Sequence, residues 1–265
     1  MADIPVTDLV VTDDLLKGTF DRPKALVTGD LTGTEGITAE EIRLPRLAIS
    51  QGLSDQMMPD NSLYIPHLKL FELFNDLTNE VYGRGPLTFI PLRRDVRRIE
   101  FVPRNEGGGI VDMNVPAGDA RLKWTINEKG ESVPPVATTF DEYVVMLMRP
   151  GKQPPLEPIV ISIKHTNKFN RRAIANFNTF IKLRNAPIYS GLYTIQSVTE
   201  KNDSGTFGVP VIKNAGFLPL DTPQGKAIYD HCRKFALSLE GKEILVDRQL
   251  EEEEASFDTR VFDAQ

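Results

Sequence analysis

The sequence predicts a β-rich α+β fold with two helices, and three observations support this class. Several segments rich in β-branched, aliphatic and aromatic residues are bounded by Gly or Pro, which is typical of strands. Two other segments repeat apolar residues at steps of three and four, which is typical of helices that pack through one face. Hydrophobic residues make up 40% of the 265 residues, which is enough for a packed core.

The longest predicted strand runs from Gly83 to Arg104. Two pairs of adjacent arginines interrupt it, at Arg93, Arg94, Arg97 and Arg98. Neighbours on a strand point to opposite faces, so each pair places one guanidinium on either side. Such rows suit a polyanion, because Arg pairs with phosphate through two parallel hydrogen bonds. The alternative is a solvated edge strand whose arginines prevent aggregation, and Pro91 indicates either an edge position or a bulge.

Four further long strands are predicted, and the first two of them are expected at the centre of the sheet. They cover residues 140–149, 158–164, 188–199 and 206–217, with a hairpin loop at 200–205. A helix is expected to follow from about Thr222 to Leu239, with Pro223 in its first turn. Cys232 lies on the apolar face of this helix and is predicted to be a small buried hydrophobe.

The clearest helix begins after Thr166 or Asn167, either of which can cap it, and Pro187 ends it. Its positions away from the apolar face carry Lys168, Arg171, Arg172 and Lys182. No acidic residue occurs in this segment, which favours an anionic partner.

Charge divides the chain into three parts, which we take as its domain organisation. Residues 1–42 and 240–265 each carry nine acidic and three basic residues, whereas residues 43–239 carry a net charge of +6. We therefore expect an acidic N-terminal arm, a globular body with an irregular insert at about 105–139, and an acidic C-terminal tail. A basic body between acidic ends favours a polyanionic partner, and the alternative is that the ends are merely solvated.

The insert contains a short basic and aromatic segment, which runs from Arg121 to Ile126 and includes the only Trp of the chain, Trp124. A lone Trp is more often part of a core than a platform for nucleic-acid bases. Its position between Lys123 and Thr125, in a polar stretch flanked by prolines, keeps base stacking as a second interpretation.

Motifs of catalysis are missing from the sequence, and we expect a protein that is not an enzyme. The chain contains no Gly-x-Ser-x-Gly and no His-Glu-x-x-His segment. One cysteine and three separated histidines give no metal-ligand spacing, so neither a metal nor another cofactor is expected. Glu80, Asp95, Glu100 and Asp112 could still converge in space, which leaves a Mg²⁺-dependent nuclease as an alternative.

A cytoplasmic location is expected. The single cysteine fits a reducing compartment. The first residues, Met1 to Pro5, do not begin a basic region followed by an apolar run, as a signal peptide would. No stretch approaches the roughly 18 consecutive apolar residues of a membrane-spanning helix.

A strand-rich basic body, a helix between strands, and an acidic tail with aromatic residues together resemble the single-stranded DNA-binding proteins of tailed bacteriophages. The segments Leu77–Gly83, Phe89–Leu92 and Ala186–Tyr193 are also similar to phage proteins of that kind. The resemblance implies an OB-fold-like antiparallel barrel with one helix between strands, in the cytoplasm of an infected host cell. The chain departs from the family by its long arm and its insert. Its tail also departs, because Asp263–Gln265 follow the last aromatic residue, where bacterial members end in Pro-Phe.

The resemblance implies a protein of phage replication or recombination that binds single-stranded DNA without strong sequence preference. A basic groove would bind the phosphates through Arg93, Arg94, Arg97, Arg98, Lys123, Lys164, Lys168, Arg171 and Arg172. Bases would stack on members of a set of aromatic residues that also supplies the core: Tyr82, Phe89, Phe101, Trp124, Tyr189 and Tyr193. Replication or recombination proteins would bind the tail through Glu251, Glu252, Glu253, Glu254, Phe257 and Phe262.

Two rival functions remain open from the sequence. A protein-interaction or virion-assembly module would use the arginine-rich strand and the tail as assembly contacts. A Mg²⁺-dependent nuclease would need the carboxylates named above to meet. The sequence leaves the oligomeric state open, including a homo-oligomer.

Overall fold

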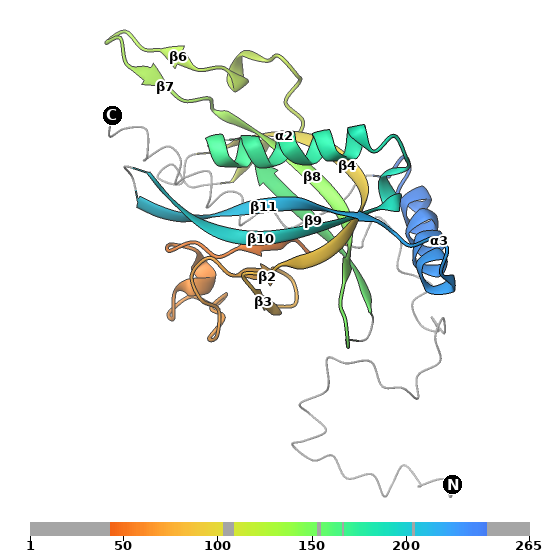
Figure 1. Cartoon of the computed structure of the whole chain (residues 1–265). Coiled ribbons are helices and arrows are strands. Elements are labelled where there is room, and N and C mark those ends of the chain that lie inside the picture. The colour runs from red at the N-terminus through yellow and green to blue at the C-terminus, as the bar shows by residue number, and fades with distance from the viewer. Residues whose placement is uncertain (1–42, 103–108, 153–154, 166, 203–204, 243–265) are drawn as a thin grey trace, which may run out of the picture.

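The computed structural model describes residues 43–102, 109–152, 155–165, 167–202 and 205–242 (Figure 1). The predicted acidic arm at 1–42 lies outside the described residues, and so does the tail from residue 243 onward, with all of its predicted partner-binding residues.

Five long antiparallel strands form the main sheet. They are β4 (Leu87–Phe101), β8 (Ala137–Met148), β9 (Leu156–Lys164), β10 (Gly191–Asn202) and β11 (Gly205–Phe217). They pair in the order β11-β10-β4-β8-β9, and the short β5 (Ile110–Asp112) pairs with the end of β4. All five strands fall on the segments predicted from the sequence.

In the part of the chain that the structure describes, the remaining elements are two small sheets, two α-helices and three 3-10 turns. The sheets are β1 (Leu47–Ile49) with β2 (Leu73–Asn75) and β3 (Val81–Gly83), and β6 (Thr125–Ile126) with β7 (Ser132–Val133). The helices are α2 (Lys168–Leu183) and α3 (Pro223–Ser238), and the turns are η2 (Asp55–Met57), η4 (Ala120–Leu122) and η5 (Ile188–Ser190). The predicted β-rich α+β class is confirmed. None of the helices in the described part of the chain is long and apolar enough to cross a membrane.

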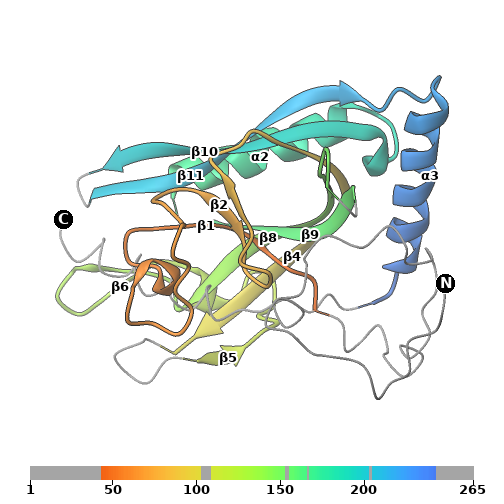
Figure 2. The same cartoon turned by 90° about the horizontal axis from the view of Figure 1, so that it is seen from below.

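Strand β4 lies inside the sheet, with β10 on one side and β8 on the other. Strand β10 pairs with β4 only at Leu87–Phe89, so among the described residues the stretch from Arg93 to Arg97 pairs with β8 alone and has the edge position that the sequence offered as an alternative. The predicted bulge is found where the pairing register shifts between Pro91 and Arg93. Proline lacks a backbone N–H, and a bulge is a place in a ladder that tolerates it. Figure 2 shows that β4 curves strongly; β10 pairs with its first residues, Leu87–Phe89, and β8 pairs with it from Phe89 to Glu100.

Four aromatic rings fill the centre of the body. Phe89, Tyr143, Phe177 and Tyr193 are all fully buried, and they come from β4, β8, α2 and β10. The centroids of Tyr143 and Phe177 are 4.7 Å apart, and those of Phe177 and Tyr193 are 5.0 Å apart. Helix α2 packs these rings against the concave side of the main sheet, through its three buried residues Ala173, Ile174 and Phe177.

A second cluster covers the opposite face of β4 and β8. Helix α3 packs its predicted apolar face, Ile228, Cys232, Phe235 and Leu239, against buried residues of these strands. Cys232 is fully buried, as predicted, and burial raises the pKa of its thiol to about 11. Both helices begin as expected, because Asn167 caps α2 by accepting a bond from the Asn170 amide and Thr222 caps α3 in the same way.

The two outer strands of the main sheet, β9 and β11, do not pair with each other in the described residues. Helix α2 packs across both of them (Figure 1), and the small β1-β2-β3 sheet contacts both as well. The Val160 amide of β9 donates to the Pro45 carbonyl at 2.8 Å. At β11, the side-chain amide of Gln51 donates to and accepts from the backbone of Gly208, both at 3.0 Å.

Gly208 is required at this contact. A Cβ atom added there would lie 2.7 Å from the Cγ2 atom of Ile49 and 3.1 Å from the side chain of Phe71. Any larger residue would push β11 away from the small sheet, so the absence of a side chain is what allows the Gln51 contact.

Candidate nucleic-acid interface

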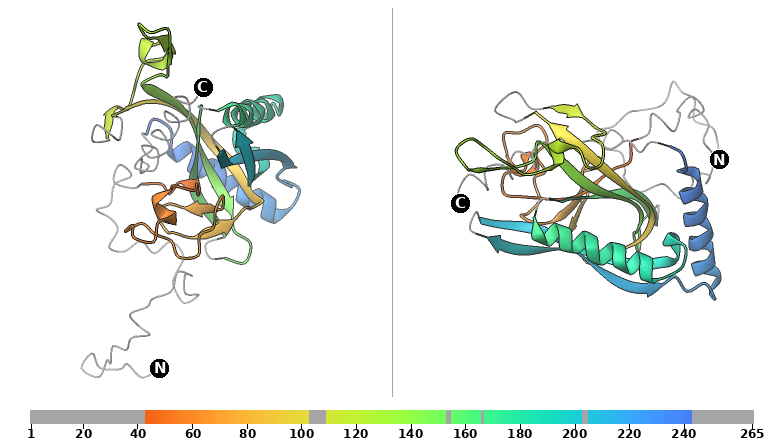
Figure 3. Two further views of the ribbon diagram at one scale, coloured as in Figure 1. Left: turned by 90° about the vertical axis from the view of Figure 1, so that its left-hand side faces the viewer. Right: turned by 90° about the horizontal axis from the view of Figure 1, so that it is seen from above.

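Three segments that are distant in sequence project from one end of the body. They are the insert with its β6-β7 hairpin, the start of α2, and the turn between β10 and β11 (Figures 1 and 2). The views in Figure 3 agree, and α3 lies at the opposite end. The ring centroids of Phe169 and Phe207 are 5.9 Å apart, which joins the start of α2 to the start of β11.

These segments carry exposed basic residues. Five of them, Lys123, Lys168, Arg171, Arg172 and Lys201, are what we call the loop-end cluster. Four of them were predicted as phosphate-binding residues, and Lys201, near the end of β10, was not. Within the described residues, neither Arg171 nor Arg172 makes a side-chain hydrogen bond or ion pair.

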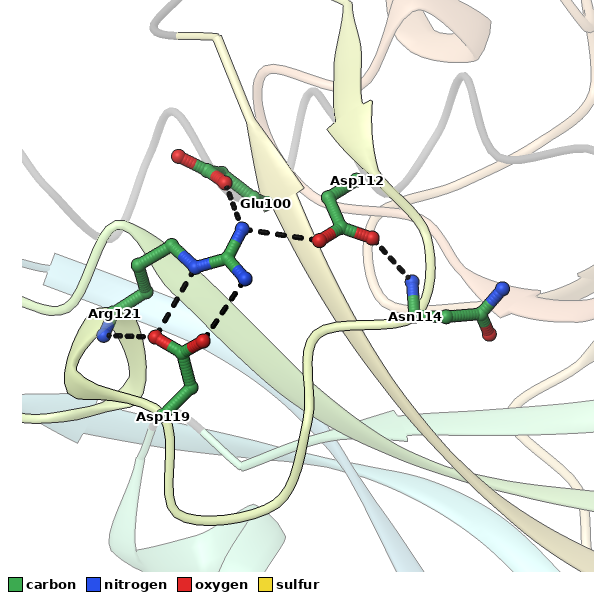
Figure 4. A network of polar contacts seen from close by, with 5 residues as sticks. All are labelled: Glu100, Asp112, Asn114, Asp119 and Arg121. Carbon is green, nitrogen blue, oxygen red and sulfur yellow. Dashed lines mark hydrogen bonds and ion pairs between the residues drawn. The ribbon is translucent and has the colours of Figure 1, made fainter.

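The insert is fixed to the sheet by one arginine (Figure 4). Arg121 in η4 binds both carboxylate oxygens of Asp119, through Nε at 3.1 Å and Nη2 at 2.9 Å. Its Nη1 atom donates to Glu100 of β4 at 2.7 Å and to Asp112 of β5 at 3.0 Å. The hydrogen bonds from the Arg121 side chain and backbone amide lower the pKa of Asp119 to about 2. Trp124 follows three residues later and is 49% exposed.

The arginines of β4 are mostly occupied by carboxylates, which differs from their predicted role. Arg93 binds Asp95 and donates through Nη1 to the carbonyl oxygens of Leu239 and Lys242, at 2.6 and 2.8 Å. Its partners therefore lie at the end of α3, far from the loop-end cluster. Arg97 lies 3.8 Å from Glu142 and donates to Asn114 at 3.1 Å.

Two other predicted phosphate-binding residues are less exposed than expected. Arg98 is half-buried in β4, and among the described residues its side chain has no hydrogen bond or ion pair. Lys164 is only 5% exposed, although it is the last residue of the outer strand β9, where it pairs with Phe140. A buried ammonium group cannot reach a phosphate without a change of position, so the prediction for Lys164 is wrong for this conformation.

The predicted stacking residues divide into core and surface. Phe89 and Tyr193 belong to the central aromatic cluster, so neither offers a face to a base, and their prediction is wrong for this conformation. Tyr82, Phe101 and Tyr189 are half-buried: the Tyr82 hydroxyl donates to Glu157, Phe101 packs on Phe140, and Tyr189 packs on Tyr229. Of the six predicted residues, Trp124 alone belongs to the exposed class.

A polar network around the buried carboxylate of Asp141 was missed from the sequence. The carboxylate of Asp141, in β8, binds both Arg94 of β4 and His165, which lies just before α2. The residues are distant in sequence, and an acidic residue in an apolar strand, Phe140–Arg149, was the only signal that could have indicated it.

The carboxylates considered for a nuclease do not converge. Glu100 and Asp112 meet at Arg121, whereas Glu80 binds Arg149 and Asp95 binds Arg93. In the described part of the chain, no group of three or more His, Cys, Asp or Glu residues is placed to bind a metal ion.

Comparison with known proteins gives one match. Neither the curated proteins nor the solved structures contain a match to this chain. The model of one phage protein family matches residues 17–245, which include the whole main sheet, both helices and the insert. The chain therefore belongs to the Pam3 phage gp34-like protein family.

Proposed function

We propose that this phage protein binds single-stranded DNA through an OB-type barrel, and that it acts by binding and not by catalysis. The strand order supports this proposal. An OB fold is a partly open, five-stranded Greek-key barrel. With β4, β8, β9, β10 and β11 as its five strands, the first strand pairs with the second and the fourth, and α2 occupies the connection between the third and the fourth.

The positions of the loops support the same proposal. OB folds bind oligonucleotides on the face of strands 2 and 3 and with the loops between strands 1 and 2 and between strands 4 and 5. In this chain those loops are the insert and the β10-β11 turn, which project from the same end of the body. The strong curve of β4 brings them together, since an uncurved strand would leave them at opposite ends.

The observation that carries the proposal is the loop-end cluster with Trp124 beside it. Lys123, Arg171 and Arg172 are exposed cations that can pair with phosphates, and the last two have no partner in the described residues. Trp124 can stack on a base, which contributes about 1–3 kcal/mol per base. Contacts of this kind involve the DNA backbone and the faces of the bases, so we expect little sequence preference. A protein that binds single-stranded DNA in this way would act in phage replication or recombination.

The first test is the fluorescence anisotropy of a labelled dT oligonucleotide at about 50 and about 200 mM salt. We expect tight binding at low salt that weakens at least about tenfold, because bound cations release counterions from the DNA. The double variant Arg171→Ala/Arg172→Ala should bind more weakly and lower the salt slope by about 2.

A matched control is available on α3. Arg233 and Lys234 are also adjacent, exposed and basic, but they lie at the opposite end of the body. Arg233→Ala/Lys234→Ala should bind like the wild type. Equal losses in both double variants would show that net charge, and not the loop-end cluster, determines binding. No binding of wild-type protein at either salt concentration would refute the proposal and favour an assembly module.

The insert gives a second test of the same interface. Trp124→Ala should weaken binding about tenfold, which corresponds to the loss of one stacked base. Ile126→Ala removes another exposed apolar residue of the same hairpin, which is 77% exposed, and should leave binding unchanged. Equal affinities of the two variants would exclude stacking on Trp124.

A further inference from the structure

Arg94 and His165 are bound by one buried carboxylate. Arg94 Nε donates to Oδ1 of Asp141 at 2.5 Å, and its Nη2 atom contacts the same oxygen. His165 Nε2 lies 2.5 Å from the other oxygen, Oδ2. The three residues come from β4, β8 and the segment just before α2, so the fold brings them together from distant parts of the chain.

The carboxylate is fixed from the interior by the core. Tyr143 is fully buried, and its hydroxyl lies 3.4 Å from Oδ1 of Asp141 and 2.8 Å from Oδ1 of Asn178 in α2. Burial raises the pKa of Asp141, but the bond from His165 and the charge of Arg94 outweigh it, so that the pKa lies below its usual value. Asp141 is therefore ionised at neutral pH and can orient both partners.

The acidic side chain, Asp141, is buried, whereas the two basic side chains that it binds, Arg94 and His165, are partly exposed to solvent. The side chain of Asp141 is only 1% exposed, whereas those of Arg94 and His165 are 40% and 36% exposed. Solvent therefore meets two nitrogen-rich groups, with the carboxylate behind them. The printed contacts of Arg94 to Asp141 use Nε and Nη2, and that of His165 uses Nε2, so Nη1 of Arg94 and Nδ1 of His165 are the nitrogens that a ligand would meet.

We propose that Arg94 and His165 form a subsite for one phosphate group, oriented by Asp141. The subsite rests on the proposed DNA-binding function and adds His165 to its contacts. Lys168 and Arg171 lie three and six residues after His165, at the exposed start of α2, so the subsite adjoins the loop-end cluster. Arg can bind a phosphate through two parallel hydrogen bonds, and a carboxylate behind it fixes the plane of the guanidinium.

The phosphate could be an internal phosphodiester or a terminal phosphate of the strand, and the oligonucleotide distinguishes them. A dT oligonucleotide with a 5′-hydroxyl offers internal phosphates alone, whereas the same oligonucleotide with a 5′-phosphate offers both. If His165→Gln weakens the binding of both probes equally, the subsite binds an internal phosphodiester. A loss confined to the phosphorylated probe would assign it to the strand end.

His165→Gln is the variant of choice, because a glutamine amide can still donate to Asp141 while the second ring nitrogen is lost. We expect about tenfold weaker binding of at least one probe, in line with the loss of one charge-assisted contact. His67→Gln changes an exposed loop histidine and is the matched control. Wild-type binding with an unaffected His165→Gln variant would overturn the subsite alone, whereas absence of wild-type binding would overturn the proposed function.

Nuclear magnetic resonance gives a readout that a purely structural role of His165 would not produce. The chain has three histidines, so their ring resonances can be assigned by the His165→Gln and His67→Gln variants. At about pH 6, addition of the dT oligonucleotide should shift the His165 resonances. His231 lies on α3 at the other end, and its resonances should not move. Unshifted His165 resonances at saturating oligonucleotide would refute the subsite.

Discussion

Two pairs of adjacent arginines have opposite surroundings in this molecule. Arg93 and Arg94 in β4 both bind carboxylates, and Arg93 also binds backbone carbonyls, whereas the exposed Arg171 and Arg172 in α2 make no side-chain hydrogen bond or ion pair in the described residues. The sequence around each pair gave both the same predicted role.

Secondary structure accounts for the difference. Neighbours on a strand point to opposite faces, so Arg93 meets the end of α3 and Arg94 meets Asp141 on the other side of the sheet. Neighbours on a helix are about 100° apart, so both members of a pair can lie on the solvent side of a helix that buries only one face. Adjacent basic residues therefore indicate a binding surface more directly on an amphipathic helix than on a strand, where one of the two faces away from that surface.

The largest expected effect is on stability, from Arg93→Ala. The substitution removes the ion pair with Asp95 and two bonds to the carbonyls that end α3. We expect the free energy of unfolding to fall by about 2 kcal/mol, since hydrogen bonds to charged groups contribute about 1.5–3 kcal/mol each and part of the site stays hydrated. Urea denaturation measures it, and DNA affinity should stay within about twofold of wild type. A large loss of DNA affinity with an unchanged free energy of unfolding would show instead that Arg93 binds DNA and does not stabilise the fold.

The thiol of Cys232 reports on the same contact. It is fully buried under α3 and burial raises its pKa to about 11, so a thiol reagent at about pH 8 should react slowly with the native protein. Because Arg93 binds the end of α3, Arg93→Ala should speed labelling about tenfold through local opening of that helix. Arg171→Ala is the control and should label at the wild-type rate. Equal labelling rates in the wild type and both variants would show that Arg93 does not hold α3 against the sheet.

The helix arginines should show the reverse pattern. Arg171→Ala should lower DNA affinity about fivefold at low salt, as expected for one phosphate contact, and change the free energy of unfolding by less than about 0.5 kcal/mol. Lys182 lies near the other end of α2 and is equally exposed, so Lys182→Ala should bind almost as well as the wild type. Anisotropy titrations of both variants measure this gradient. An equal loss of DNA affinity in Arg171→Ala and Lys182→Ala would show that the interface extends along the whole of α2.

The smallest expected effect is a local loosening of the insert in acid. The depressed pKa of Asp119, about 2, means that its bond to Arg121 is fully formed above about pH 4, the usual range of an unfolded Asp, and is lost as the pH falls through about 2. Trp124 is the only Trp, so its fluorescence anisotropy follows the insert, and it should fall over this pH window.

Arg121→Gln controls for this loosening. The variant lacks the guanidinium that binds Glu100, Asp112 and Asp119, so Trp124 should already be mobile at neutral pH (Figure 4). Far-ultraviolet circular dichroism recorded in parallel separates the loosening from acid unfolding of the body. Identical neutral-pH anisotropy in variant and wild type would mean that Arg121 does not fix the insert.

Local pattern was sufficient to predict the elements. The apolar run around β4 and the three- and four-residue steps of α2 and α3 are properties of short segments, and all three elements were found, the two helices with their N-caps. The bulge in β4 was also predictable, because Pro91 cannot donate to a ladder.

Pairing across the sheet was not predictable from local pattern. Whether Arg94 meets Asp141 depends on the β4-β8 register, which places the two residues on the same face. The aromatic residues pose the same problem. Phe89 and Trp124 are both large and apolar, and only the path of the chain makes the first a core residue and the second an exposed one.

The contact between Gln51 and Gly208 has a consequence for motion. One side-chain amide, with two hydrogen bonds, joins the edge of β11 to the small sheet, so rotation of that side chain separates the two while every strand ladder stays paired. Such a step costs on the order of 1–3 kcal/mol, well below global unfolding. The Gly208 amide donates to Gln51 and not to β10, so its hydrogen exchange should be faster than that of the amides that donate across the β10-β11 ladder. This edge of the body can therefore open locally while the core stays folded.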